Sequence, residues 1–284
     1  MFTKKYYSDT SMSLPDLKGS RSLYLTLYDA DHPDSFLSCA QIQEISPKTG
    51  VARFEHDGIR GHIKIRQVSP FHPAILSVKL RGLHDVAGSF HIHQFPVPTR
   101  HDQDHVTCSQ TGGHFNPYNI DKSSSPSTAT GTVDQYEVGD LSGKFGDLTG
   151  RERVQGTFVD PSLCVFGKNS VVGRSIVIHH SPVPSRWVCA NIELEHRPMM
   201  TAVATFTYPV GGRVMFRQEM DNPLGDTSVF VEGLVYTDGT KNYTADHRWH
   251  VHTDIPGKDY FNWTGRCLSA GSHFNPYRIT EDKR

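Results

Sequence analysis

Three histidines and one cysteine recur in this chain at a constant offset of 159 residues. The paired positions are His91 and His250, His93 and His252, His114 and His273, and Cys108 and Cys267. Imidazole nitrogens are good ligands for copper, zinc, iron and nickel, so the repeated set predicts a transition-metal site. Any one of these histidines alone would be read as an ordinary surface or core residue, but the duplication of the set favours metal binding.

The residues around the first copy indicate strands and a turn that would bring these side chains together. Residues two apart in a strand point to the same face, so His91 and His93 project together, away from their neighbours. His114 follows a Gly-Gly turn, where the backbone can bend a third imidazole inward. His179 ends an apolar strand and supplies a fourth imidazole; His180 is the alternative, and strand alternation favours His179.

The rest of the chain also predicts an all-β fold. Leu76, Val78 and Leu80 alternate with polar residues, which is the period of a half-buried strand. Turn residues separate several such segments, and no segment of helical length shows a 3.6-residue period. Short strands separated by turns are typical of a β-sandwich or β-barrel.

Composition excludes several classes of partner. The chain has 284 residues, with 29 basic and 30 acidic side chains, so no charge excess indicates nucleic acid or an anionic membrane. No apolar run reaches the length of a membrane span. Two N-glycosylation sequons, at Asn242 and Asn262, together with the cysteines favour a secreted or cell-surface protein.

The repeat extends beyond the histidines and divides the chain into three parts. Residues 52–67 resemble 204–218, residues 20–25 resemble 173–178, and residues 38–42 resemble 188–192. The expected organisation is the C-terminal half of one repeat (1–45), a complete repeat (46–195) and the N-terminal half of a further repeat (196–284). A complete repeat of about 150 residues is an ordinary domain size.

The complete repeat resembles the copper/zinc superoxide dismutase family. Five motifs stand in the family's order: Ser89-Phe-His-Ile-His93, Cys108…His114-Phe-Asn-Pro117, Glu137-Val-Gly-Asp-Leu141, Gly173-Arg-Ser-Ile-Val-Ile-His179 and Arg186-Trp-Val-Cys189. The resemblance implies an eight-stranded Greek-key β-barrel, which is a flattened sandwich.

The resemblance also implies roles for individual residues. The implied copper ligands are His91, His93, His114 and His179. His114 would in addition carry a proton during catalysis, and Arg186 would draw superoxide towards the copper. Cys108 and Cys189 match the family disulfide. The simpler alternatives are that Arg186 is a solvated surface charge and that the two cysteines are unpaired.

The zinc half of the family's site is incomplete here. Residues 118–136 contain no histidine, and Glu137 stands where the family has one. Only Asp140 and the bridging His114 remain, which are too few for a closed zinc site, so we expect copper without zinc, as in the family's copper-only branch. One hypothesis is that Asp140 accepts a hydrogen bond from the second nitrogen of His114 and that Glu137 supports this network. Alternatively, Glu137 is an ordinary loop carboxylate.

One loop is longer than is usual in the family. The insertion spans residues 96–105 and contains His101 and His105. A solvated loop is the favoured interpretation, and weak metal binding by the two histidines is the alternative.

These features predict copper-dependent dismutation of superoxide to dioxygen and hydrogen peroxide by residues 46–195. Two alternatives belong to other classes: an extracellular protein that binds or buffers copper, and a structural repeat protein with little catalysis. The partners expected are superoxide and, for the flanks, neighbouring repeats or a second chain.

The flanking halves carry an incomplete copy of the site. His250, His252 and His273 could form a degenerate metal site, but the position that matches His179 falls near Thr26, where no histidine stands in register. In the favoured interpretation the chain is a segment of a longer repeat protein, and each half pairs with residues beyond it. In the alternative, the two halves form a circularly permuted barrel.

The permuted barrel makes a prediction about two cysteines. Cys39 matches Cys189 and Cys267 matches Cys108, so a disulfide between Cys39 and Cys267 would close the barrel. Peptide mapping under non-reducing conditions tests this pairing, and absence of the crosslinked peptide would contradict the permuted barrel.

Overall fold

A computed structural model of the whole chain describes residues 8, 10, 23–97, 108–222, 225–240, 247–262, 264–276 and 278. His101, His105 and the sequon residue Asn242 lie outside these ranges. The chain divides into two compact units, of which one comprises residues 1–201 with 217–228 and the other comprises residues 202–216 with 229–284.

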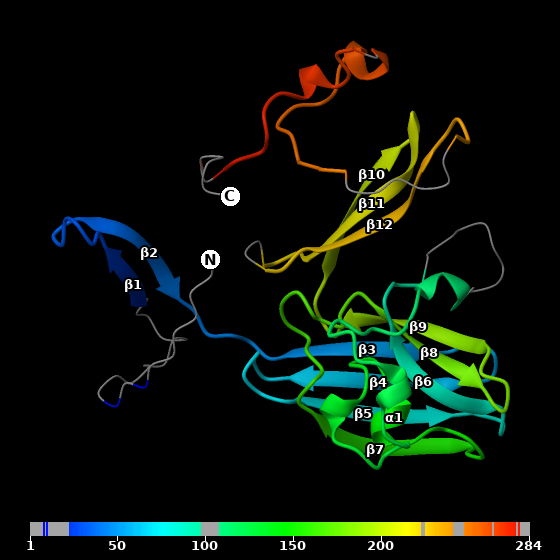
Figure 1. Cartoon of the computed structure of the whole chain (residues 1–284). Helices are drawn as coiled ribbons and strands as arrows, with labels where there is room; N and C mark the ends of the chain where they lie inside the picture. The colour runs from blue at the N-terminus through cyan, green and yellow to red at the C-terminus, as the bar shows by residue number, and fades with distance from the viewer. Residues whose placement is uncertain are drawn as a thin grey trace. The chain divides into compact units, whose positions relative to one another are not determined.

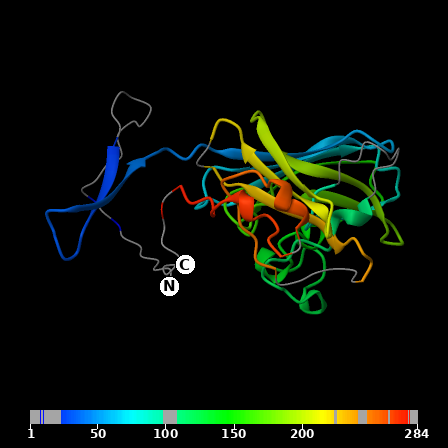
Figure 2. The ribbon, with the colours of Figure 1, turned by 90° about the horizontal axis from the view of Figure 1, so that it is seen from above.

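Seven strands in the middle of the chain form one curled sheet (Figures 1 and 2). They are β3 (Lys48–Phe54), β4 (Arg60–Gln67), β5 (Ala74–Arg81), β6 (Ala87–His93), β7 (Arg153–Asp160), β8 (Ser175–His180) and β9 (Arg186–Leu194). The order is β6-β8-β9-β3-β4-β5-β7, and every neighbouring pair is antiparallel. The connections from β5 to β6 and from β7 to β8 therefore cross between opposite ends of the sheet, as in a Greek key. The all-β fold class is confirmed.

The segment from Gly139 to Leu148 lies beside β6 but forms no strand. The amide of Ile92 donates to the carbonyl of Gly139 over 2.8 Å, and the amide of Leu148 donates to Gly88 over 2.9 Å. Between these points the backbone forms the short helix α1 (Leu141–Phe145). The side chain of Asp140 caps this helix by accepting from the amide of Gly143 over 2.7 Å. Among the described residues the curled sheet therefore has seven strands, whereas the family resemblance implied eight.

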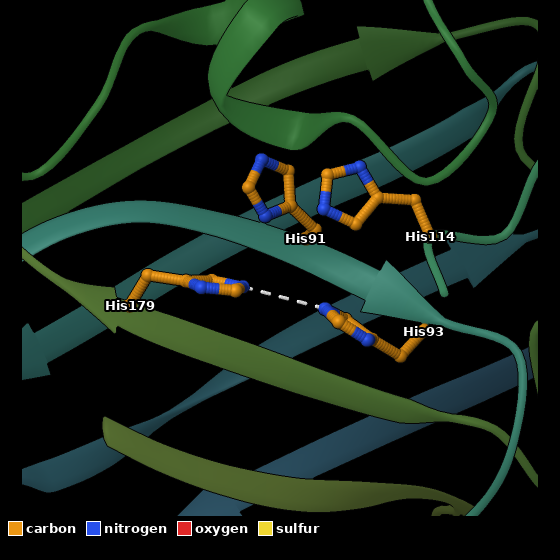
Figure 3. Close-up of side chains that lie close together, drawn as sticks. All are labelled: His91, His93, His114 and His179. Carbon is orange, nitrogen blue, oxygen red and sulfur yellow. Dashed lines mark hydrogen bonds between the residues drawn. The ribbon is translucent and has the colours of Figure 1, made fainter. Parts of the chain in front are cut away.

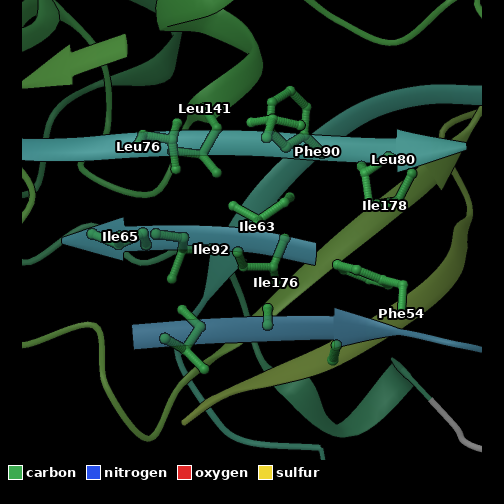
Figure 4. Close-up of a cluster of buried hydrophobic side chains, with 14 of the residues drawn as sticks. Phe54, Ile63, Ile65, Leu76, Leu80, Phe90, Ile92, Leu141, Ile176 and Ile178 are labelled. Carbon is green, nitrogen blue, oxygen red and sulfur yellow. The ribbon is translucent and has the colours of Figure 1, made fainter. Parts of the chain in front are cut away.

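The hydrophobic core lies inside the curl of the sheet, where side chains from its strands meet (Figure 4). Leu76, Val78 and Leu80 of β5 are at most 2 % exposed, which confirms the predicted alternation. Phe90 and Ile92 of β6 enter the same core cluster. Burying one such side chain contributes roughly 1.5–3 kcal/mol, so the core fixes the register of the strand that carries His91 and His93.

A buried ion pair fastens α1 to the end of β7. The ammonium of Lys144 donates to Asp160 Oδ2 over 2.8 Å and to the hydroxyl of Ser162 over 2.7 Å, and the side chains of the ion pair have no exposed area. A third bond runs from Lys144 to the carbonyl of Val138 over 2.9 Å. Burial lowers the pKa of Lys144, and the Asp160 carboxylate opposes that effect. The pair therefore holds the segment between Glu137 and Asp140 in one position.

The predicted disulfide between Cys108 and Cys189 is confirmed. It joins the 3-10 helix η1 (Cys108–Thr111) to β9 across a sequence separation of 81 residues. A crosslink that closes a loop of this length stabilises the fold by about 4 kcal/mol on chain-entropy grounds. Cys39, Cys164 and Cys267 are free thiols, and the pairing of Cys39 with Cys267 stays a prediction.

The flanking parts form small sheets of their own. β1 (Leu23–Tyr28) and β2 (Phe36–Ile42) pair as a hairpin, whereas β10 (Met199–Phe206), β11 (Val210–Glu219) and β12 (Ser228–Tyr236) form a three-stranded sheet. The order β10-β11-β12 mirrors β3-β4-β5, as the internal repeat predicts. Val203, Val229 and Val231 are among its exposed apolar side chains.

The helices in the described part of the chain are all short. Besides η1 and α1 they are η2 (Lys122–Ser124), η3 (Val133–Gln135), η4 (Lys258–Phe261) and η5 (Leu268–Ala270). None of these described helices has the length and apolar character needed to cross a membrane.

Removal of one partner of the buried ion pair is expected to destabilise the fold strongly. Lys144→Met leaves the Asp160 carboxylate buried without its counter-charge, and we expect the free energy of unfolding to fall by about 3–5 kcal/mol in urea denaturation. The double variant Lys144→Met with Asp160→Asn keeps an acceptor for the amides of Ser162 and Leu163, and should recover much of the loss. Equal stability of the single variant and the parent would contradict the assigned role.

Candidate metal centre

Four imidazoles from separate parts of the central domain converge on one point (Figure 3). His91 and His93 come from β6, His179 from β8, and His114 from the loop that follows η1. Each ring offers one nitrogen to a group in which all four atoms lie within 4.8 Å of one another. The structure therefore brings together all four residues that the sequence predicted as ligands.

The backbone around β6 explains how a loop histidine reaches two strand histidines. His93 and His114 form an isolated antiparallel bridge. The amide of Phe115 donates to the carbonyl of Ile92 over 2.8 Å, and the amide of Gly139 donates to Phe115 over 2.8 Å. The loop thus runs as a short extra strand beside β6. Because Ile92 points into the core, His91 and His93 point to the opposite side, where the loop lies.

Three of the four rings are fixed through Nδ1, which leaves Nε2 facing the centre. The Nδ1 of His93 lies 2.9 Å from the carbonyl oxygen of Gly112, and that of His179 lies 3.2 Å from the carbonyl oxygen of Pro184. The Nδ1 of His114 lies 2.6 Å from Glu137 Oε2. Each of these oxygens accepts a hydrogen bond, so Nδ1 carries the hydrogen and Nε2 keeps a free lone pair.

In His91 the roles of the two nitrogens are exchanged, so that Nε2 faces an oxygen of the protein and Nδ1 faces the centre. Its Nε2 lies 3.5 Å from Asp140 Oδ1, whereas its Nδ1 is buried and has no hydrogen-bond partner among the described residues. Buried polar atoms are nearly always paired, so an orphan nitrogen that faces three other nitrogens needs an explanation. A metal ion at the centre of the four rings accounts for this atom, and the donor set fits copper.

The electrostatics of the cluster favour the neutral form of His91, His93 and His179. Burial, reinforced by neighbouring imidazoles, lowers the pKa of His91 far below its ordinary value. Burial likewise lowers the pKa of His93 to about 4, and it lowers the pKa of His179. Neutral imidazole is the form that binds a metal, so these ligands need not release a proton at physiological pH.

Glu137, not Asp140, holds the second nitrogen of His114. The contact with His114 lowers the pKa of Glu137, and Asn116 Nδ2 donates to its other oxygen over 3.3 Å. The hypothesis that Asp140 accepts this hydrogen bond is therefore wrong. Asp140 is committed to capping α1, which directs its carboxylate towards His91 instead. Both carboxylates do lie beside the predicted ligands.

Arg186 reaches the turn that precedes His114. Its guanidinium donates to the carbonyls of Cys108, Ser109 and Gly112 over 2.8, 2.6 and 2.5 Å. Its charge is close enough to act on His93 and His179, whose pKa values it helps to lower. Arg186 is thus a fixed positive charge beside the cluster as well as a support for the turn.

Several contributors to the site could not be read from residue types. The carbonyls of Gly112 and Pro184 orient two rings, and Lys144 fixes the segment that bears the carboxylates. Of these features, only the turn at Gly112 was indicated by the sequence, through its Gly-Gly pair. Gly112 adopts φ of 74°, a conformation that favours glycine. His180 stacks on Trp187 with ring centroids 5.5 Å apart, so His179 rather than His180 belongs to the cluster.

Comparison with known proteins identifies the family of the chain. The family model of copper/zinc superoxide dismutase matches residues 59–184. A Cu-Zn superoxide dismutase of Schizosaccharomyces pombe is 33% identical over 128 residues, which cover 43% of this chain and 74% of that protein. The chain belongs to the copper/zinc superoxide dismutase family.

Other superoxide dismutases give similar matches. A cell surface Cu-only superoxide dismutase 5 of Candida albicans is 33% identical over 150 residues, which are 51% of this chain and 60% of that protein. The chain thus spans about three fifths of the length of this relative. A solved structure of a mutant superoxide dismutase 5 of the same organism is 29% identical, with a TM-score of 0.42, and covers 53% of this chain and 94% of that one.

The Glu137 carboxylate is expected to strengthen copper binding through His114. Glu137→Gln keeps an acceptor at the same place but removes the negative charge, so we expect copper affinity in the central site to fall about 10- to 100-fold. Competition with a copper chelator measures the affinity. Asp134→Asn is the matched control, because Asp134 is an exposed carboxylate on the same segment, and it should leave the affinity unchanged. An unchanged affinity in Glu137→Gln would make Glu137 an ordinary loop carboxylate.

Proposed function

We propose that residues 46–195 catalyse copper-dependent dismutation of superoxide to dioxygen and hydrogen peroxide at a zinc-free site. The observation that carries this proposal is the set of four imidazole nitrogens turned towards one point, with the buried Nδ1 of His91 among them. Membership of the family supports copper as the occupant and superoxide as the substrate.

The proposed residues that hold the copper are His91, His93, His114 and His179. Copper bound there would accept an electron from one superoxide, which leaves as dioxygen, and return it to a second, which leaves as hydrogen peroxide after taking up two protons. Carbonyl contacts to His93 and His179 fix the rings at every stage. Rigid ligands limit the rearrangement that accompanies electron transfer, which favours repeated turnover.

His114 is the proposed carrier of a proton. Its Nδ1 donates to Glu137, and this contact fixes the orientation of the ring. Nε2 would hold a proton for the peroxide product only while it is not bound to copper, and it can take up that proton from solvent because the His114 side chain is 17% exposed. Such a role is general acid catalysis by an imidazole.

Arg186 is proposed to attract the anionic substrate. The chain as a whole is almost neutral, so long-range steering of superoxide is weak and a fixed local charge must supply the attraction. Three carbonyl contacts hold the guanidinium in one orientation beside the cluster. Preorganised charge of this kind needs little rearrangement when the substrate arrives.

The proposed absence of zinc follows from the contacts of His114. The nitrogen that would bridge to a second metal faces the Glu137 carboxylate at 2.6 Å. Asp140, the remaining family zinc ligand, caps α1 through its side chain. The name of the Candida albicans Cu-only relative agrees with a site of this type.

The proposed location is extracellular, and the proposed domain is the central repeat. Relatives in Candida albicans are named as cell surface superoxide dismutases, and disulfides such as that of Cys108 and Cys189 persist in oxidising compartments.

Residues 46–195, the proposed domain, include strands β3 to β9. Residues 1–45 and 196–284 are proposed to be halves of neighbouring repeats, with neighbouring repeats or a second chain as partners.

Direct superoxide decay tests the function. The full chain is reconstituted with copper and no zinc, and is compared with His179→Ala, which removes one ligand, and with the matched control His180→Ala, whose ring lies outside the cluster. We expect fast decay in the parent and the control, and a loss of about 100-fold or more in His179→Ala, since even the partners of ligands alter activity 10- to 100-fold. Slow decay in every protein despite bound copper would overturn the proposal and favour a copper-binding scaffold.

A further inference from the structure

A second group of three imidazoles lies outside the central domain. His250, His252 and His273 each offer a nitrogen, and these atoms lie within 4.8 Å of one another. The rings of His250 and His273 stack with centroids 4.1 Å apart, and those of His252 and His273 lie 5.1 Å apart. The corresponding separations in the central site are 3.9 Å and 5.2 Å. The two groups thus have nearly the same arrangement.

The backbone that holds the second group also repeats the central site. His252 and His273 form an isolated antiparallel bridge, and the amide of Phe274 donates to the carbonyl of Val251 over 2.7 Å. The Nδ1 of His252 lies 2.9 Å from the carbonyl oxygen of Gly271, which leaves its Nε2 available to a metal. These contacts all lie within residues 250–274, so a short piece of chain orders the ligands by itself.

Gly271 is the residue that makes this local order possible. It adopts φ of 77°, close to the 74° of Gly112 in the central site. A side chain at this φ is strained, and a Cβ at Gly271 would also have to displace the Asp254 side chain, whose Oδ2 would lie 2.1 Å away. The carbonyl that orients His252 therefore depends on glycine in the same way as the carbonyl that orients His93.

We propose that His250, His252 and His273 form a second copper site. Three imidazoles without a carboxylate are a donor set that prefers copper(II) among the divalent first-row metals. His250 and His252 are exposed, so solvent can complete the coordination and reach the ion. The site should therefore release copper to a chelator faster than the buried central site, which has a fourth imidazole.

The proposed role of this site is reversible binding of copper by the three imidazoles. A solvent-open ion that exchanges readily suits the uptake or holding of copper at the surface. The inference is independent of the proposed dismutase activity, because it concerns the number of bound copper ions.

Copper counting in the full chain tests the proposal. The metal-free protein is loaded with copper(II), freed of unbound metal by gel filtration, and analysed by elemental analysis and by EPR spin quantitation. We expect two copper ions per parent chain, and one in His252→Ala and in His250→Ala. His247→Ala is the matched control, because His247 is an exposed histidine of the same segment outside the cluster, and it should keep two.

Two results would overturn the proposal. One is a parent chain that binds a single copper ion, and the other is a His252→Ala chain that still binds two. A parallel loading with zinc(II) tests the metal assigned, since copper(II) added afterwards should displace zinc from this site; retention of zinc would contradict the assignment. Circular dichroism checks that the variants keep their β structure, as substitution of exposed side chains should allow.

Discussion

The site depends on the different roles that the protein gives to the two nitrogens of each imidazole. One nitrogen of His93, His114 and His179 is held by an oxygen of the protein, and the other faces the centre. His91 completes the set with a buried nitrogen that has no partner among the described residues. An arrangement that leaves four lone pairs in one place is unfavourable without a cation, so the fold is organised around a metal.

The β-barrel supplies the rigidity that this arrangement needs. The core fixes the register of β6 through Phe90 and Ile92, and the register decides the direction of His91 and His93. Loops cover the other side of β6. They are held by the disulfide between Cys108 and Cys189 and by the hydrogen bond from the buried Lys144 ammonium to the carbonyl of Val138. Each loop is tied to the barrel close to the residue that it presents.

The sequence predicted the ligands well because their types and spacing are chemically restrictive. Alternation along β6 was enough to place His91 and His93 on one face, and the repeat showed that His114 belongs with them. The disulfide and the all-β class were also predicted. What the sequence missed was the separate roles of Glu137 and Asp140, because these depend on the short helix α1, which no helical period in the sequence predicted. Residue types alone do not show which carboxylate will cap the N-terminus of a helix.

The repeat also shows how little chain is needed to arrange imidazoles. Residues 250–274 reproduce three ring positions through one bridge and one glycine turn. The fourth imidazole, the paired carboxylates and the arginine come from segments that only the complete barrel brings together. Local backbone order can therefore bring three imidazoles together, whereas the proposed catalysis needs the long-range contacts of the whole domain.

The central claim is that four imidazoles bind one copper ion and that Glu137 takes the place of zinc beside His114. Anomalous diffraction at the copper and zinc absorption edges, from crystals of protein offered both metals, tests it most directly. We predict a copper peak in the central domain within bonding distance of Nδ1 of His91 and of Nε2 of His93, His114 and His179, with Glu137 still on Nδ1 of His114. A zinc peak between His114 and Asp140, or a copper peak that excludes His91, would contradict it.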